Sequence, residues 1–235
     1  MALRLHAALT TARYDGQTEW YEAFARGEAH AAAREFATGL LGAGPGACLD
    51  LGTGTGLAVP ALVRAGWSVV GADISEDQLA RARSQHGASA EFVRADAQAL
   101  PFGDEEFDAV VSFLTHTDFD EPRKAFGEAH RVLRSGGRFV YLGVHPCFGS
   151  PFVARERARD IDGVVAVVLP GYATAGWRPI PSESTGEGVT ARVGINHRPL
   201  ADFLNAVIGS GFTLTEVHEP GEADPPIFFA FTATK

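Results

Sequence analysis

The sequence contains few cysteines and no long apolar segment. Its two cysteines, Cys48 and Cys147, are too few for a disulfide framework and are not spaced like the ligands of a metal site. No run of about 18 or more apolar residues is free of charged or turn-forming residues, and residues 1–13 lack the pattern of a secretory signal peptide. We therefore expect a cytoplasmic protein with neither a metal centre nor a membrane partner.

The chain also has little positive charge. Lysine and arginine together number 20 against 29 aspartate and glutamate residues, which gives a formal net charge of −9. Because nucleic-acid binding depends largely on basic side chains that neutralise phosphates, DNA and RNA are not expected as partners. Only Lys124 and Lys235 are lysines, a bias typical of a GC-rich bacterial genome.

Short apolar runs alternate with helical patterns along most of the 235 residues, of which 46% are hydrophobic. Such alternation, with short Gly and Asp turns between the segments, is typical of right-handed βαβ units. We predict an α/β fold, a Rossmann-like doubly wound sheet of about seven strands with the last strand antiparallel. The predicted single domain divides into N-terminal helices (1–44), a core (45–143), an insertion (144–198), and a last helix with edge strands (199–235).

The insertion at 144–198 shows no regular period. It is rich in proline and glycine, and an irregular stretch of this length inside a compact domain is usually a lid or a binding element. Its aromatic residues are candidates for lining an apolar pocket, although part of the set is expected to pack in the core. These residues are Phe148, Phe152, Tyr172 and Trp177.

A glycine-rich turn follows the first predicted strand. Residues 48–56 read Cys-Leu-Asp-Leu-Gly-Thr-Gly-Thr-Gly, so Asp50 lies two positions before Gly52. A turn without Cβ atoms lets a ligand lie against backbone N–H groups. The dinucleotide fingerprint G-x-G-x-x-G would need a glycine at Leu57, whereas the third glycine here is Gly56. This spacing disfavours a nicotinamide-dependent oxidoreductase, which remains a rival hypothesis.

The pattern Asp-x-Gly-x-Gly-x-Gly resembles the first motif of the class I S-adenosylmethionine-dependent methyltransferases, and its closest branch is the ubiquinone-biosynthesis-like one that acts on small molecules. The resemblance continues along the chain. Asp73 ends the second predicted strand, Asp96 follows the third, and residues 107–113 and 132–141 resemble the fourth and fifth strands. S-adenosylmethionine carries a positive sulfonium charge and no phosphate. It therefore suits a site surrounded by the carboxylates of Asp50, Asp73 and Asp96.

The resemblance implies S-adenosylmethionine as cofactor and S-adenosylhomocysteine as product. In the family, the acid at Asp73 binds both ribose hydroxyls, the acid at Asp96 accepts from the adenine amine, and the residue at Ile74 lies against the adenine face. Each acid also has a purely structural interpretation as a helix N-cap, and Gln78 as an exposed residue. The other predicted cofactor-binding residues are Tyr14, Tyr21, Asp50, Gly52, Thr53, Gly54, Gly56, Gln78, Ala97 and Phe113.

A hydroxyl acceptor needs a group that takes its proton, and histidine, with a pKa of about 6.5, is well suited to this. His116 and His145 follow the fourth and fifth predicted strands, whose carboxyl ends border the ligand crevice of an open α/β sheet. We predict them as candidate catalytic residues, with simple loop histidines as the alternative. Trp20 and His197 complete the predicted substrate-binding set, with core packing and helix capping as their respective alternatives.

We therefore predict an enzyme that transfers a methyl group to a small, partly apolar acceptor, with a hydroxyl in bacterial secondary metabolism as the expected target. An alternative of a different class is a methyltransferase-like protein that binds S-adenosylmethionine as a structural ligand, or that promotes a cyclisation without methyl transfer. The acceptor side of the sequence shows no group that distinguishes the two.

Overall fold

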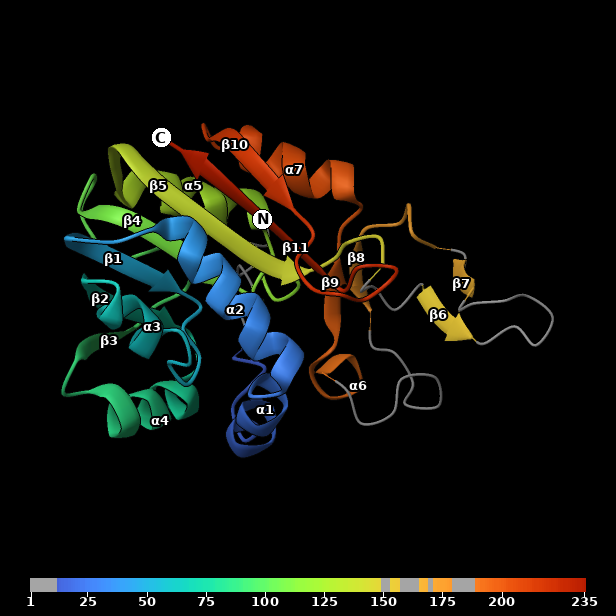
Figure 1. Cartoon of the computed structure of the whole chain (residues 1–235), viewed down its shortest axis with the longest axis horizontal. Coiled ribbons are helices and arrows are strands. Elements are labelled where there is room, and N and C mark those ends of the chain that lie inside the picture. The colour runs from blue at the N-terminus through green and yellow to red at the C-terminus, as the bar shows by residue number, and fades with distance from the viewer. Residues whose placement is uncertain (1–11, 149–152, 157–164, 169–170, 179–188) are drawn as a thin grey trace, which may run out of the picture.

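The computed structural model describes residues 12–148, 153–156, 165–168, 171–178 and 189–235 (Figure 1). The predicted substrate-binding residue Phe152 lies outside these segments. In the segments that are described, no helix combines the length and the apolarity needed to cross a bilayer.

Seven strands form the central sheet. They are β1 (Gly46–Leu51), β2 (Trp67–Asp73), β3 (Ala90–Arg94), β4 (Phe107–Phe113), β5 (Leu133–Val144), β10 (Thr213–His218) and β11 (Phe228–Thr234). Their order is β10-β11-β5-β4-β1-β2-β3, and β1 lies parallel to both neighbours, β2 and β4. β11 pairs antiparallel with β5 and with β10. The predicted doubly wound sheet with an antiparallel last strand is confirmed.

Helices cover both faces of the sheet (Figure 1). They are α1 (Thr18–Ala25), α2 (Glu28–Leu41), α3 (Val59–Arg64), α4 (Glu76–His86), α5 (Pro122–Val132) and α7 (Leu200–Ile208). On one face α5 and α7 bury a core that includes Phe126, Phe139 and Phe203. On the other face α2 and α3 bury Leu41 and Leu62. The sheet is therefore the middle layer of three, as in other doubly wound folds.

Strand β4 shows why the central strands read as continuous apolar runs in the sequence. Side chains alternate between the two faces, so Ala109 and Val111 enter the core beneath α2 and α3, while Val110 enters the core beneath α5 and α7. The next residue, Ser112, is polar and fully buried. Its Oγ bonds to the Leu51 carbonyl oxygen at 3.1 Å and to Thr115 Oγ1 at 2.6 Å. These bonds tie the carboxyl end of β4 to that of β1.

The helical pattern predicted near the N-terminus forms two helices, α1 and α2, which are separated at Gly27. A buried carboxylate joins α1 to α4, since Glu22 accepts hydrogen bonds from Arg26 and Gln85 through Oε1 and from Arg81 through Oε2, at 2.7 to 2.8 Å. Burial alone would raise the pKa of Glu22, but these three donors lower it to about 2. Glu22 thus remains ionised and fastens α1 to the core.

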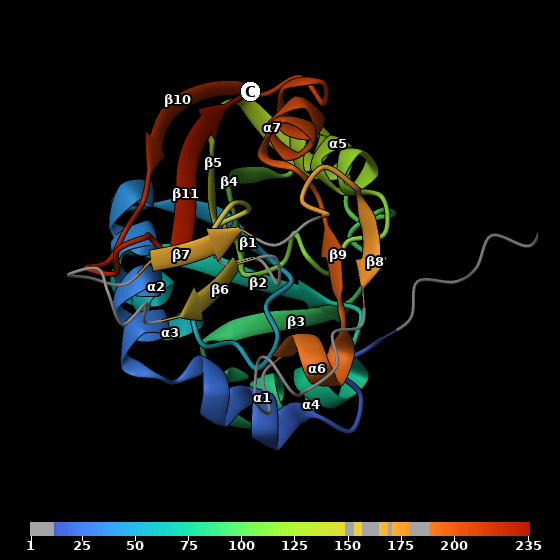
Figure 2. The same ribbon diagram turned by 90° about the vertical axis from the view of Figure 1, so that its right-hand side faces the viewer.

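The insertion contains short strands. β6 (Val153–Glu156) pairs antiparallel with β7 (Val165–Val168), and β8 (Gly176–Arg178) pairs with β9 (Ile195–His197), which follows α6 (Val189–Val193). Figures 1 and 2 place these elements at the end of the molecule toward which β1, β4 and β5 point. The Asn196 N–H donates to the Thr117 carbonyl at 2.7 Å, which attaches β9 to the loop after β4. Strands of three or four residues are too short to show a period in sequence.

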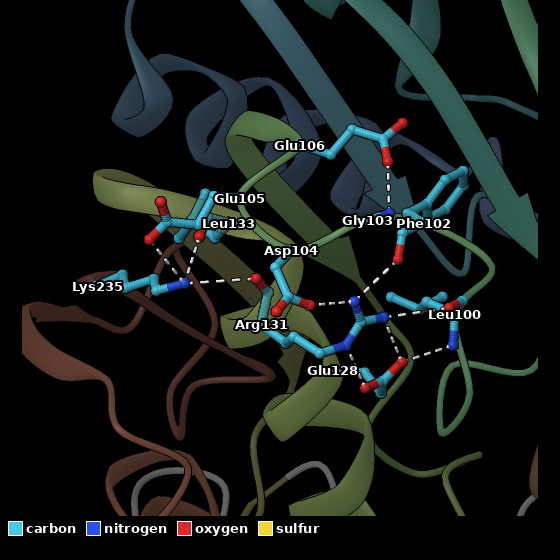
Figure 3. A network of polar contacts seen from close by, with 10 residues as sticks. All are labelled: Leu100, Phe102, Gly103, Asp104, Glu105, Glu106, Glu128, Arg131, Leu133 and Lys235. Atoms are coloured by element: carbon cyan, nitrogen blue, oxygen red, sulfur yellow. Dashed lines mark hydrogen bonds and ion pairs between the residues drawn. The ribbon is translucent and has the colours of Figure 1, made fainter.

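Arg131 on α5 fastens the loop between β3 and β4 (Figure 3). Its guanidinium donates to both carboxylate oxygens of Glu128 at 2.8 Å, to Asp104 at 2.8 Å and to the Phe102 carbonyl at 2.9 Å. Glu128 also accepts from the Leu100 N–H at 2.7 Å. The bidentate geometry holds both partners in place and makes each bond charge-assisted.

Replacement of Arg131 by alanine should lower the free energy of unfolding by about 2 kcal/mol, because it removes several charge-assisted hydrogen bonds at once. Arg64→Ala is the matched control. Its 3.8 Å pair with Glu35 is largely exposed, so its loss should cost less than about 0.5 kcal/mol. Urea unfolding followed by circular dichroism measures both values. Equal losses for the two variants would show that the network does not stabilise the loop.

Candidate cofactor-binding site

The glycine turn after β1 lies between β2 and the loop after β4. The N–H groups of Gly52 and Thr53 both donate to the Ala72 carbonyl, at 2.8 and 3.0 Å. Gly52 has a φ of 75°, and a Cβ atom there would lie 2.3 Å from Thr115 Cγ2. Only glycine fits this position, because both the conformation and the close approach exclude a side chain.

A cavity of about 770 Å³ opens at the carboxyl ends of β1 to β4. This is where the strand order reverses, with β1 between β2 and β4, and ligands of open α/β sheets bind at such switch points. The lining residues are Arg13, Tyr14, Tyr21, Leu51, Gly52, Gly54, Ala72, Asp73, Ile74, Gln78, Ala95, Asp96, Ala97, Gln98, Phe113, Leu114, Thr115, Asp118 and Phe119.

Two of the predicted acids are held on this cavity by backbone amides. Asp73 accepts from the N–H of Gly54 through Oδ2 and from that of Ser75 through Oδ1, both at 2.9 Å. Burial nevertheless raises the pKa of Asp73, since these bonds only partly offset the loss of water. Asp96 accepts from the Gln98 N–H at 2.9 Å. The amides use part of each carboxylate's accepting capacity, and the remaining lone pairs are available to a ligand.

Asp50 faces a second, adjoining cavity of about 390 Å³, which shares Gly52 and Gly54 with the first. Asp50 is only 2% exposed and accepts from Thr53 Oγ1 at 2.6 Å. Burial raises the pKa of Asp50 to about 6, against the lowering effects of Thr53 and Arg34. Arg34, on α2, lines the same cavity. A carboxylate can bind the ammonium group of an α-amino acid, and a guanidinium can bind its carboxylate, so this pair of side chains suits an amino-acid ligand.

Gln78 provides a test of whether the cavity fits a polar ligand. Its side chain is 2% exposed and lines the main cavity, yet neither its amide nitrogen nor its amide oxygen has a hydrogen-bond partner among the described residues. A buried amide without partners costs about 1 to 3 kcal/mol. A nucleoside with hydroxyl and ring-nitrogen groups can supply both partners, so the residues present fit the cofactor that the sequence implies.

The structure brings most of the predicted cofactor-binding residues together. Asp50 and Thr53 line the second cavity, and Gly56 lines neither, since the space beside it is filled by His86, Ala82 and Phe92. The others line the main cavity: Tyr14, Tyr21, Gly52, Gly54, Asp73, Ile74, Gln78, Asp96, Ala97 and Phe113. Their contacts with the cofactor itself remain predictions.

The predicted catalytic histidines lie elsewhere. A separate, small cavity of about 210 Å³ is lined by His116 and His145, together with His197, which was predicted to bind the substrate. Burial, together with His197, lowers the pKa of His116 to about 3, and its Nδ1 bonds to the hydroxyl of Tyr141. His145 Nε2 contacts Glu219 at 2.8 Å, and His145 Nδ1 accepts from the N–H of Cys147. These partners account for both side chains in structural terms, and the catalytic role stays a prediction.

The predicted substrate-binding residues that are described do not line the main cavity either. Trp177 contacts Arg13, a residue that lines the main cavity, and the Arg13 guanidinium lies 3.4 Å above the Trp177 ring. The Nε1 of Trp177 donates to Asp120. Tyr172 is held by its hydroxyl, which accepts from the Leu200 N–H, and its carbonyl bonds to His197. Trp20 stacks on Phe24, and Phe148 lies 4.7 Å from His145 between ring centroids.

Three charged residues of the site were not predicted: Arg13, Arg34 and Asp118. Asp118 had a usable signal, since it is a polar residue in the loop after β4, at the same sheet edge as the predicted acids. Arg13 and Arg34 belong to the N-terminal segment, far in sequence from the strands, and carry no local signal. Among the described residues no group of three His, Cys, Asp or Glu side chains is placed to hold a metal.

These features define a nucleoside-binding domain of the doubly wound class. Residues 49–141 match the family described as a methyltransferase domain. A demethylmenaquinone methyltransferase of Thermus thermophilus is 47% identical over 107 residues, which is 43% of this chain and 49% of that protein. O-methyltransferase cnsE of Penicillium expansum is 37% identical over 116 residues, 46% of this chain and 42% of that protein. The chain thus spans about half the length of the curated relatives it matches.

A solved structure of an S-adenosylmethionine-dependent methyltransferase from Mesorhizobium loti superposes with a TM-score of 0.71 at 26% identity, over 87% of this chain and 98% of that one. Residues 49–141 thus match a methyltransferase domain, and the chain is similar to class I S-adenosylmethionine-dependent methyltransferases, among them demethylmenaquinone methyltransferases; these matches support S-adenosylmethionine as the cofactor.

Asp73→Ala should weaken S-adenosylmethionine binding about tenfold or more, since a hydrogen bond to a charged group contributes roughly 1.5 to 3 kcal/mol. The matched control is Glu76→Ala, because Glu76 is exposed and forms its ion pair with Arg83, at the surface and away from the cavity. Isothermal titration calorimetry measures the affinities, and thermal unfolding confirms that both variants fold. A folded Asp73→Ala protein with wild-type affinity would remove Asp73 from the site.

Cofactor affinity should fall at acidic pH because of Asp50. Its pKa of about 6 in the free protein means that the carboxylate is present above pH 6 and is neutralised below it. A cationic ligand binds the carboxylate form, so one such group reduces affinity about tenfold between pH 7 and pH 5. Calorimetry at both pH values tests this, and Asp50→Asn should bind more weakly at pH 7 and show a smaller pH dependence, the remainder coming from Asp118, whose pKa is about 7. A wild-type affinity that is flat over this interval would contradict the assignment.

Proposed function

We propose that this protein transfers the methyl group of S-adenosylmethionine to a hydroxyl group of a small, partly apolar acceptor in bacterial secondary metabolism. The observation that carries the proposal is the main cavity, in which two amide-held acids adjoin an apolar wall and Gln78, whose side-chain amide has no hydrogen-bond partner in the described part of the chain. Ile74, Phe113 and Phe119 belong to that wall. One curated relative is named an O-methyltransferase, which supports oxygen as the acceptor atom.

Each cofactor part has a candidate partner. Asp73 is placed to accept hydrogen bonds from the ribose hydroxyls. Asp96, which follows β3, is placed to accept a hydrogen bond from the adenine amine. Arg34 and Asp50 are placed to hold the amino-acid end in the second cavity. The cofactor supplies an electrophilic methyl group on a sulfonium. The contribution of the chain is to hold that group and the acceptor in line, which can lower a barrier by about 7 to 11 kcal/mol.

The proposed acceptor side is formed by the N-terminal segment and the loop after β4. Arg13 and Tyr14 come from the former, and Thr115 and Phe119 from the latter. Aromatic and aliphatic walls exclude water and favour a partly apolar molecule, while a few polar groups orient it. Arg13 is fixed by Asp120, with Nη2 to Oδ1 at 3.0 Å. A small aromatic alcohol or hydroquinone fits this combination.

The test uses two acceptors with the same ring system. The protein is incubated under anaerobic conditions with S-adenosylmethionine carrying a carbon-13 methyl group and with either 1,4-dihydroxynaphthalene or 1-naphthylamine. We expect S-adenosylhomocysteine formation and a methoxy carbon in the first product, with a much slower reaction of the amine. The carbon-13 chemical shift separates methyl on oxygen, nitrogen and ring carbon.

The other outcomes have distinct meanings. Label on nitrogen or on ring carbon would overturn the choice of oxygen and keep the methyltransferase. Tight cofactor binding with no transfer to either compound, or to any molecule of a bacterial extract, would favour the alternative in which the cofactor is a structural ligand. The Asp73→Ala variant serves as the control with weakened cofactor binding, and it should transfer label more slowly at subsaturating S-adenosylmethionine.

A further inference from the structure

One acid that lines the main cavity, Asp118, has no proposed contact with the cofactor. Asp118 lies in the loop after β4, five residues beyond the last residue of the strand, and its half-buried side chain lines the cavity. The hydroxyl of Tyr14 lies 3.3 Å from each of its two carboxylate oxygens. Tyr14 is itself packed edge-on against Tyr21, with ring centroids 4.7 Å apart. The acid is thus oriented by a side chain about 100 residues away in sequence.

The position of Asp118 separates it from the acids assigned to the cofactor. Asp50, Asp73 and Asp96 come from the ends of β1, β2 and β3, which form one side of the switch point. Asp118 comes from the other side, next to Phe119 on the proposed acceptor wall. A carboxylate there, oriented by a donor and open to the cavity, is placed to receive a proton from a bound hydroxyl.

We propose that Asp118 is the general base of the reaction and that Tyr14 is its positioning residue. This inference rests on the proposed function, since only an acceptor that loses a proton needs a base. In the step, the acceptor O–H bond breaks and Asp118 takes the proton. The acceptor oxygen forms its bond to the methyl carbon as the S–CH₃ bond breaks, and that electron pair stays on sulfur to give the neutral thioether. Asp118 returns the proton to solvent after product release.

The charged groups around Asp118 suit this role. Burial raises the pKa of Asp118 to about 7, the Tyr14 hydrogen bond lowers it, Asp73 raises it and Arg13 lowers it. Tyr21 on α1 and Tyr141 on β5 are close enough to interact electrostatically with the Asp118 carboxylate. Burial, together with this charge, raises the pKa of both tyrosines, so both stay protonated and neutral. A base is most effective when its pKa is near the working pH. A cation bound in the same cavity favours the carboxylate form further.

The decisive variant is Asp118→Asn, which keeps the size of the side chain and an oxygen that accepts from Tyr14. With 1,4-dihydroxynaphthalene as acceptor, we expect kcat at pH 7.5 to fall at least 100-fold, while the affinity for S-adenosylhomocysteine, measured by calorimetry, stays within threefold. The matched control is Asp202→Asn, an exposed aspartate on α7, which should leave both quantities unchanged. Thermal unfolding verifies the fold of each variant.

The pH profile separates a base from a merely structural residue. For the wild type at saturating S-adenosylmethionine, kcat/KM for the acceptor should rise with pH along an acid limb with a midpoint at or somewhat below pH 7, and this limb should be absent in Asp118→Asn. Tyr14→Phe removes a hydrogen bond that stabilises the carboxylate, so it should move the limb to higher pH while retaining most of kcat above it. Carbon-13 NMR of labelled aspartate, compared between wild type and Asp118→Asn, reports the same titration without any acceptor.

The failures are distinguishable. A wild type that methylates oxygen together with an unimpaired Asp118→Asn variant overturns only the assignment of the base. A variant that loses cofactor affinity tenfold with kcat preserved also overturns it, and makes Asp118 a cofactor ligand. A wild type that labels only nitrogen, only carbon or nothing overturns the proposed function and this inference together.

Discussion

The site depends on three carboxylates, fully or partly buried, that line two adjoining cavities and keep lone pairs that the hydrogen bonds described above do not use. Burial raises the pKa of Asp50, Asp73 and Asp118, and the charge on Asp73 raises the pKa of the other two further. Backbone amides, Thr53 and Tyr14 offset part of this cost but not all of it. A positively charged nucleoside offsets the rest. Carboxylates in this arrangement favour a cationic ligand such as a sulfonium over one that carries phosphate.

The fold makes this burial possible by bringing two loops and the N-terminal segment into contact. Gly52 has no Cβ atom, so Thr115 of the loop after β4 can approach the turn after β1 closely. Ser112 then ties β4 to the Leu51 carbonyl. On the other side, Glu22 fastens α1 to α4 and supports the N-terminal segment that contributes Tyr14. Stability and ligand binding thus share the same contacts, which is common where a site lies between elements.

The cofactor half of the site could be predicted because its residues follow local rules. An acid at the tip of a parallel strand and a glycine turn before a helix are visible as short patterns, and parallel strands bring their carboxyl ends to one edge. The histidines show where such rules stop. His116 follows β4 as expected, yet its ring turns into the core against Phe203 and Tyr141, while Asp118, two residues later, reaches the cavity. Sequence position located the loop but not the direction of each side chain.

The sequence by itself determined the layered α/β architecture and the antiparallel last strand, and it located three acids near the carboxyl ends of neighbouring strands, because hydrophobic period, turn residues and motif spacing are local properties. Only the tertiary structure decided which residues meet across the chain. Tyr14 with Asp118, Glu22 with Arg81 and Arg34 near Asp50 join segments that no period relates. Such pairs depend on how helices pack on the sheet and on which rotamers that packing permits, and these are cooperative consequences of the whole fold.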